Sequence, residues 1–179
     1  MSKRLVISLP HAAALLLALG LAACASAPAD DAPAARVAEV PAEQMIASIR
    51  AAAGDGEGEL AVQPLRDPQV EDLRQQAARL EAQRDYAGAA AALDRALQIV
   101  DGDPALLQER AEIALLLGDY DTADQLAQRA YALGAQVGPL CRRHWATLEQ
   151  LRLRAGDAAG AASAREQIDG CKVAGPVRY

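Results

Sequence analysis

The sequence contains few aromatic residues: no Phe, one Trp and four Tyr, which together make up only 3% of its 179 residues. Histidine and cysteine are also scarce, with two and three residues. Apolar residues nevertheless reach 52%, and alanine supplies much of that share. Strands favour β-branched and aromatic residues, whereas alanine is the best helix former. The composition therefore predicts an all-α fold in which helices pack closely through small side chains.

Positive charge is in short supply as well. Lys and Arg total 18 against 24 Asp and Glu, which gives a formal net charge of −6. Two of the cations, Lys3 and Arg4, lie in an N-terminal leader, and removing them takes the charge to −6 − 2 = −8. An acidic surface repels nucleic acid and anionic lipid headgroups. We therefore expect no nucleic-acid partner, and contact with a membrane only through an attached lipid.

Motifs of catalysis are missing too. The sequence has no glycine-rich phosphate loop, no Gly-x-Ser-x-Gly elbow and no zinc-hydrolase helix motif. Its carboxylates are spaced as on exposed helix faces, not as a pair facing each other across a cleft. The sequence therefore predicts a protein that is not an enzyme, with no catalytic residue, cofactor or metal.

Residues 1–23 have the pattern of an export signal. Two basic residues precede an apolar stretch whose uninterrupted core runs from Ala12 to about Leu19, which is too short to cross a bilayer comfortably. The next residues, Leu21-Ala22-Ala23-Cys24, resemble the lipobox of bacterial lipoproteins. The resemblance implies cleavage before Cys24 and acylation of its thiol. A transmembrane anchor with an incidental cysteine is the alternative.

The lipobox resemblance also implies a location. Each buried methylene of an acyl chain contributes about 0.8 kcal/mol, and two or more chains anchor a protein stably. Ala25, and not Asp, follows the cysteine. By analogy with enterobacterial sorting, this favours the periplasmic face of the outer membrane over the inner membrane.

Residues 24–58 are rich in Ala, Pro and Asp at their start and in Gly at their end. Such a composition buries little apolar area, so we expect a flexible tether. The tether contains one short helical pattern, from Pro41 to Ala53, which the glycines at 54–58 end. Residues 59–68 are expected to form an extended segment.

The rest of the chain repeats itself at an offset of 34 residues. Asp85-Tyr86 recurs as Asp119-Tyr120, and a third copy with four extra residues aligns Gly156-Asp157 with Gly118-Asp119. Each copy predicts two helices, the first of which begins with Asp-Pro in two copies. The first helices are expected to end near Arg84, Leu117 and Arg154, and the second helices to span about Tyr86–Val100, Tyr120–Leu133 and Ala158–Ile168.

This pattern resembles the tetratricopeptide repeat, a helix–turn–helix unit of 34 residues. The marks of the family are large residues early in the first helix, small residues one turn later, a Gly-x-Tyr turn and alanines in the second helix: Leu73, Leu107, Trp145, Ala77, Ala111, Gly118-Asp119-Tyr120, Ala89, Ala96, Ala123, Ala130 and Ala161. Arg84 departs from the pattern at the first turn, and Ala158 at the third. The resemblance implies a short α-solenoid of about three hairpins over residues 69–172, followed by a tail at 173–179.

Two cysteines remain once Cys24 carries lipid. Cys141 lies at the start of one predicted helix and Cys171 just past the end of its antiparallel partner, so we predict a disulfide between them. It would close a loop of about 30 residues and contribute roughly 3–4 kcal/mol. A metal site at Cys141 and His144 is the competing interpretation, but it lacks ligands. His144 is interpreted as an ordinary residue on a helix surface.

The family resemblance implies a groove lined by the first helices, in which a partner peptide binds. The positions carried over by alignment are Arg74, Glu81, Gln108, Glu112, Leu115, Arg143, Gln150 and Arg154. An ordinary solvated face is the alternative interpretation of these residues. We therefore predict a lipid-anchored adaptor that binds an envelope protein or peptide. The alternative is a structural accessory subunit of an envelope assembly or secretion complex. The sequence is also compatible with a homo-oligomer.

Overall fold

The computed structural model describes residues 40–54 and 67–172, and these contain seven helices and no strand. The helices are α2 (Ala42–Ala53), α3 (Pro68–Ala82), α4 (Tyr86–Ile99), α5 (Pro104–Leu116), α6 (Tyr120–Leu133), α7 (Gly138–Arg154) and α8 (Ala158–Gly170). The all-α prediction is confirmed. The predicted signal peptide, Cys24 and its acylation, residues 59–66 and the tail at 173–179 lie outside the described residues.

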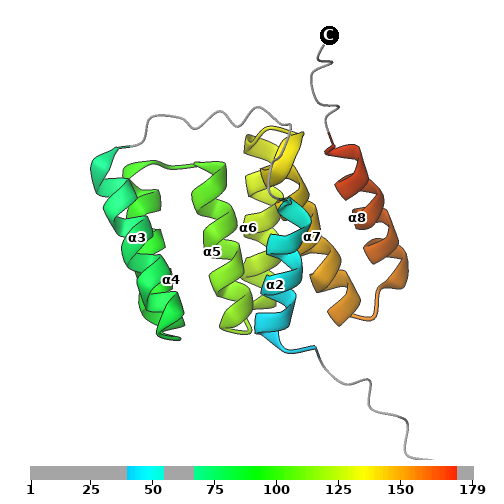
Figure 1. Cartoon of the computed structure of the whole chain (residues 1–179), viewed down its shortest axis with the longest axis horizontal. Coiled ribbons are helices and arrows are strands. Elements are labelled where there is room, and N and C mark those ends of the chain that lie inside the picture. Colours follow the sequence, from blue (N-terminus) through cyan, green and yellow to red (C-terminus); the bar gives the residue numbers. More distant parts are fainter. Residues whose placement is uncertain (1–39, 55–66, 173–179) are drawn as a thin grey trace, which may run out of the picture. The chain divides into compact units, whose positions relative to one another are not determined.

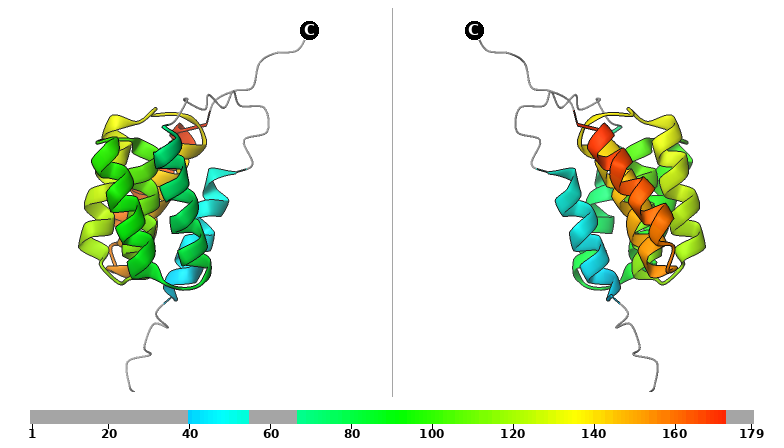
Figure 2. Two further views of the ribbon diagram at one scale, coloured as in Figure 1. Left: turned by 90° about the vertical axis from the view of Figure 1, so that its left-hand side faces the viewer. Right: turned by 90° about the vertical axis from the view of Figure 1, so that its right-hand side faces the viewer.

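The six helices after α2 form three antiparallel hairpins, α3–α4, α5–α6 and α7–α8 (Figure 1). Consecutive hairpins pack through α4 against α5 and through α6 against α7. The first helices, α3, α5 and α7, lie on one side and the second helices on the other (Figure 2). The helix bounds agree with the predicted repeat to within a few residues.

An aspartate begins five of these six helices. Each Asp side chain accepts a hydrogen bond from a backbone N–H in the first turn of its helix, as an N-cap does. The five caps are Asp67, Asp85, Asp103, Asp119 and Asp157. Pro follows the cap in α3 and α5, where a missing N–H is harmless. The sequence therefore sets the start of almost every helix locally.

The turns within the hairpins need a left-handed residue. Gly118 and Gly156 have φ angles of +77° and +74°, and Arg84, at the same position in the first hairpin, has a φ angle of +61°. Glycine adopts this region freely, whereas other L-residues are strained there by roughly 1–2 kcal/mol. The departure from the repeat at Arg84 is therefore a strained copy of the same turn, not a different turn.

Tyr86 and Tyr120 both follow a capping Asp as the first residue of a second helix. The Tyr120 ring lies 3.9 Å from the guanidinium carbon of Arg154, near the end of α7. Tyr86 lines a cleft together with Leu116, which corresponds to Arg154 in the repeat. The two tyrosines therefore occupy matching positions between consecutive hairpins.

Alanines let the helices approach closely. Those that face a neighbouring helix have no exposed surface: Ala89, Ala92, Ala96, Ala111, Ala114, Ala123, Ala127 and Ala130. Larger residues such as Leu106 and Ile113 fill the space between them. This arrangement follows from the alanine-rich composition, because small side chains shorten the distance between helix axes.

From the sequence, α2 is expected to be a short helix inside a flexible tether. The helix is present, but it belongs to the same compact unit as the hairpins, Glu39–Tyr179. It lies against α5 and α7, on the side of the first helices (Figures 1 and 2). Met45, Ile46 and Ile49 bury one face of α2 against Leu115 and Ala146. The buried apolar stripe makes α2 a seventh helix of the domain.

A disulfide joins Cys141 and Cys171, whose Cα atoms are 5.7 Å apart. It links the first turn of α7 to the end of α8. The start of α7 has no side-chain cap, and the Gly138 N–H instead donates to the Cys171 carbonyl at 2.7 Å. The disulfide and this hydrogen bond together hold the one hairpin helix that lacks an aspartate.

Candidate partner-binding cleft

Glu112 on α5 is completely buried, yet it is charged and fully hydrogen-bonded. The Nη2 of Arg143, on α7, lies 2.7 Å from one carboxylate oxygen, and the Nε of the same side chain bonds the other. Arg50 on α2 donates from its Nε at 2.9 Å. Gln108 adds a further donor at 2.9 Å. A buried carboxylate requires such partners, and here they come from three helices.

Gln108 connects this cluster to His144, which is also completely buried. The Gln108 side-chain nitrogen donates to Glu112 and to the Thr147 hydroxyl, so its oxygen accepts from His144 Nδ1 at 2.7 Å. Burial, and then the nearby Arg143 guanidinium, lower the pKa of His144 to about 4, against a smaller opposing effect of Glu112. The histidine is therefore neutral at pH 7. The expectation of a surface histidine is wrong, because α7 turns this side chain into the core.

Three of the predicted groove residues are not available to a partner. Gln108, Glu112 and Leu115 have no exposed surface. The alignment placed them on the inner face of the first helices, which is correct, but α2 covers that face. Arg142 completes the attachment by donating to the carbonyls of Ala52 and Ala53, at 3.2 and 3.1 Å from its Nε. A cation at the C-terminus of a helix satisfies its last carbonyls.

The other five predicted groove residues separate into two groups. Arg74, Glu81 and Arg143 line an open cleft beside α2. Gln150, partly buried, and Arg154, over the ring of Tyr120, do not line it. Arg50 belongs to the cleft but was missed, because α2 was assigned to the tether. The signal that could have found it is the stripe Met45, Ile46, Ile49, which an isolated tether helix would leave exposed.

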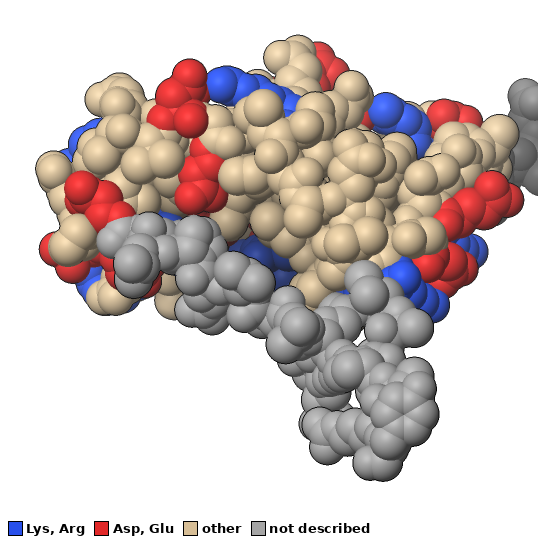
Figure 3. All heavy atoms as spheres, turned by 90° about the horizontal axis from the view of Figure 1, so that it is seen from above, with Lys and Arg blue, Asp and Glu red and all other residues tan. Residues whose placement is uncertain are grey.

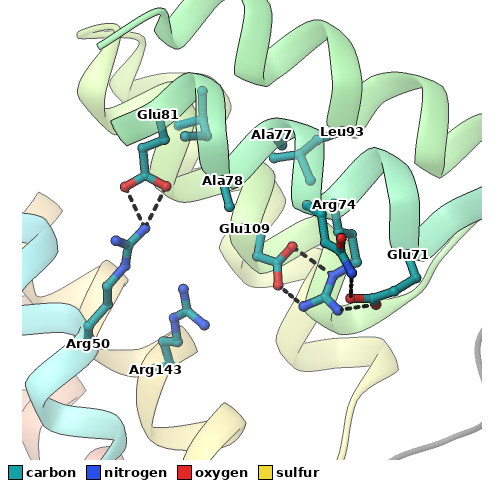
Figure 4. A pocket seen from close by; sticks show the side chains of 11 residues that line it. Arg50, Glu71, Arg74, Ala77, Ala78, Glu81, Leu93, Glu109 and Arg143 are labelled. Atoms are coloured by element: carbon teal, nitrogen blue, oxygen red, sulfur yellow. Dashed lines mark hydrogen bonds and ion pairs between the residues drawn. The ribbon is translucent and has the colours of Figure 1, made fainter. Parts of the chain in front are cut away.

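The cleft runs between α2 and α3, and α5 forms its floor. Its wider part has a volume of about 290 Å³, with Ala77, Ala78 and Ile113 among its apolar residues (Figure 4). A second part, of about 300 Å³, continues past Ala47 toward Tyr86. The two parts meet at an ion pair, in which Arg50 reaches across to Glu81 at 2.8 Å.

Charge is distributed unevenly over the walls. Arg50 and Arg143 project from the α2 and α7 side, whereas Glu71 and Glu81 lie along α3 (Figure 4). Arg74 is neutralised locally, because its guanidinium forms two hydrogen bonds with Glu109 and one with Glu71. Hydrogen bonding to Glu109 raises the pKa of Arg74 against a smaller opposing effect of burial. Burial lowers the pKa of Arg50, but its interactions with Glu112 and Glu81 outweigh that effect and raise it. All three arginines therefore remain cations.

Other functional classes find little support among the described residues. No three His, Cys, Asp or Glu side chains gather as a metal site requires, and Cys141 is engaged in the disulfide. None of the described helices has the length and apolar character of a membrane span. Seen from above, acidic and basic residues alternate around a continuous uncharged area (Figure 3). Such a mixed surface fits a protein ligand better than a polyanion.

Capped hairpins in register, with an accessory helix on one face, define a helical-hairpin repeat domain. No family model and no curated protein matches the chain in sequence. Among solved structures, the globular C-terminal domain of P. aeruginosa LpoP is similar, with 32% identity and a TM-score of 0.55. The match covers 59% of this chain and 99% of that domain. The helical domain of this chain belongs to the family of that LpoP domain.

Proposed function

We propose that the chain is a lipid-anchored adaptor of the bacterial envelope, with no catalytic activity of its own, whose helical domain binds another envelope protein. The observation that carries the proposal is the 32% identity to the LpoP domain over almost its whole length. The lipobox-like Leu21-Ala22-Ala23-Cys24 supports the lipid anchor, and Ala25 supports the outer membrane. The open cleft between α2 and α3 supports a binding role.

Peptidoglycan synthases of the penicillin-binding class are the partner we propose first. Helical-repeat lipoproteins serve several envelope machines, and the likeness to LpoP favours this one. An adaptor on a short tether also suits a partner that works close to the membrane, because the tether limits the reach of the domain. On this proposal the chain changes the activity of the synthase by binding it.

The test uses the full chain with a C-terminal tag, purified in detergent from the envelope of its own host. Binding to each purified penicillin-binding synthase of that host is measured by surface-immobilised titration, and glycan polymerisation is followed with and without the chain. We expect one synthase to bind at micromolar concentration or tighter and to change its rate. Binding by none of the synthases would contradict the choice of partner.

The lipid anchor is tested separately with Cys24→Ser. Intact-mass measurement of the purified wild-type chain should show the added acyl mass on a chain that begins at Cys24, and the variant should lack it. The variant should also leave the membrane fraction. A wild-type chain that retains residues 1–23 without acyl mass would favour the transmembrane alternative.

A further inference from the structure

The helix α2 has a seat on α5 and α7, and the repeat supplies a second seat of the same kind. Arg50 contacts Glu112 on α5, and the apolar face of α2 packs against Leu115 on α5 and Leu151 on α7. Moving back by one repeat, 34 positions on α5 and 38 on α7, gives three counterparts: Ala78, Glu81 and Ile113. All three line the open cleft. The cleft is therefore the position that α2 would occupy one hairpin earlier, on α3 and α5.

We propose that this second seat takes an amphipathic helix of the envelope partner, which lies alongside α2. This inference rests on the proposed adaptor function. The cleft follows α3 from Glu71 to Ala82, which corresponds to about 16 Å or three helical turns. Helices dock into such grooves by laying an apolar stripe along the floor. The small side chains of Ala77 and Ala78 let another helix approach closely.

The walls determine the chemistry of the docked helix. On the α2 and α7 side, Arg50 and Arg143 share Glu112, and within the described residues the Nη1 group of each donates to no acceptor. These free donors fit a carboxylate on one edge of the partner helix. On the opposite side, Glu71 and Glu81 fit a basic residue on the other edge. The partner helix therefore has a small or aliphatic stripe flanked by acidic residues on one edge and basic residues on the other.

Glu81 already shows how a carboxylate is received. It lies across the cleft from Arg50 and bonds it at 2.8 Å, although 44% of the Arg50 side chain remains exposed. An exposed ion pair of this kind is worth little and opens readily. A carboxylate of the partner can therefore replace Glu81 on Arg50, while Arg50 keeps its bond to buried Glu112. The cluster around Glu112 fixes the arginine in place for this exchange.

The test introduces a photo-reactive benzoylphenylalanine into the full chain at Ala78 and at Ala47, two exposed positions on opposite walls. Matched controls carry it at Ala91 on α4 and Ala132 on α6, which are exposed alanines on the opposite side. We expect cross-links to a purified penicillin-binding synthase from the two cleft positions only. The linked peptide should form a helix with the stated stripe and charged edges.

A second measurement uses Ala78→Trp, which fills the cleft, with Ala91→Trp as its control. We expect the affinity for the synthase to fall at least tenfold in Ala78→Trp and less than twofold in Ala91→Trp, while both keep the helical content of wild type. Unchanged affinity in both variants, or cross-links to an extended segment, would overturn the helix seat and leave the adaptor function standing. Wild-type chain that binds no synthase would overturn both.

Discussion

Arg50 and Glu112 are 62 positions apart in sequence and form a hydrogen-bonded ion pair, with 2.9 Å between Nε and a carboxylate oxygen. This pair joins the first described helix to the middle of the repeat. Arg143 approaches the same carboxylate from α7, so three helices meet at one buried charge. The pair explains why α2 is part of the domain and why Arg50 lies at the edge of the cleft.

Removing both arginines from Glu112 should destabilise the protein more than the sum of the single changes. Arg50→Met and Arg143→Met each leave one cation on the carboxylate, so we expect a loss of about 1–2 kcal/mol for each. The double variant leaves a buried carboxylate without a cation and should lose roughly 4–5 kcal/mol. Urea unfolding of the four proteins measures the coupling.

The control for this series is Arg129→Met, which removes an exposed ion pair with Asp101. We expect a change below about 0.5 kcal/mol, because solvent screens such pairs. Strictly additive losses in the double variant would show that Glu112 does not depend on the two cations.

Replacing Arg84 with glycine should stabilise the first hairpin. Relief of the left-handed strain contributes roughly 1–2 kcal/mol, and the greater freedom of glycine in the unfolded chain offsets about 0.5–1 kcal/mol of that gain. We expect a net gain of about 0.5–1 kcal/mol by thermal or urea unfolding. The reverse change, Gly118→Ala, should lose a similar amount, and a stability loss in Arg84→Gly would show that the arginine side chain has a role in the turn.

Local signals in the sequence predict the hairpins well. A capping Asp before Pro, the Gly-Asp-Tyr turn and the spacing of alanines each act within a few residues, so Asp67, Asp103 and Gly118 fall where the repeat predicts them. The strained turn at Arg84 also follows from the repeat, since the same backbone position needs a left-handed residue.

Protonation of His144 should destabilise the folded protein as the pH falls. Its folded pKa is about 4, below the value of about 6.5 expected in the unfolded chain. Between these values the unfolded state binds a proton that the folded state does not, so stability decreases from pH 6.5 toward pH 4 and this contribution is then complete. The difference corresponds to about 3 kcal/mol. Urea unfolding across this pH range measures it.

The comparison for this experiment is His144→Asn, which keeps a donor for Gln108 but does not titrate. The variant should be less stable than wild type at pH 7.5 and should lose less stability between pH 6.5 and pH 5. An equally steep loss in the variant would assign the pH dependence to other groups.

Reduction of the disulfide between Cys141 and Cys171 should loosen the last hairpin. The bond closes a loop with a sequence separation of 30 residues, so the chain-entropy relation gives a contribution of about 3.6 kcal/mol. We expect the midpoint of urea unfolding to fall on reduction and amide exchange in α8 to rise. Cys141→Ser with Cys171→Ser should behave like the reduced protein and should no longer respond to reductant.

The position of α2 could not be read from the sequence. Met45, Ile46 and Ile49 indicate that one face of the helix is buried, but twelve residues of unknown path, 55–66, separate it from the repeat, and periodicity does not name the surface it covers. For the same reason Gln108, Glu112 and Leu115 were expected at an open groove. Leu106, Leu107 and Ile113 around them already suggest a helix that is apolar on all sides, and such helices are buried.

Native-state hydrogen exchange of the full chain decides most directly whether α2 is part of the folded domain. If α2 is seated on α5 and α7, the amides of its second and third turns, including Ile49, should open with a free energy within about 1 kcal/mol of those of Ile113 in α5. Exchange of the Ile49 amide at the rate of a free peptide, while Ile113 stays protected, would contradict the seat of α2 and the cleft that depends on it.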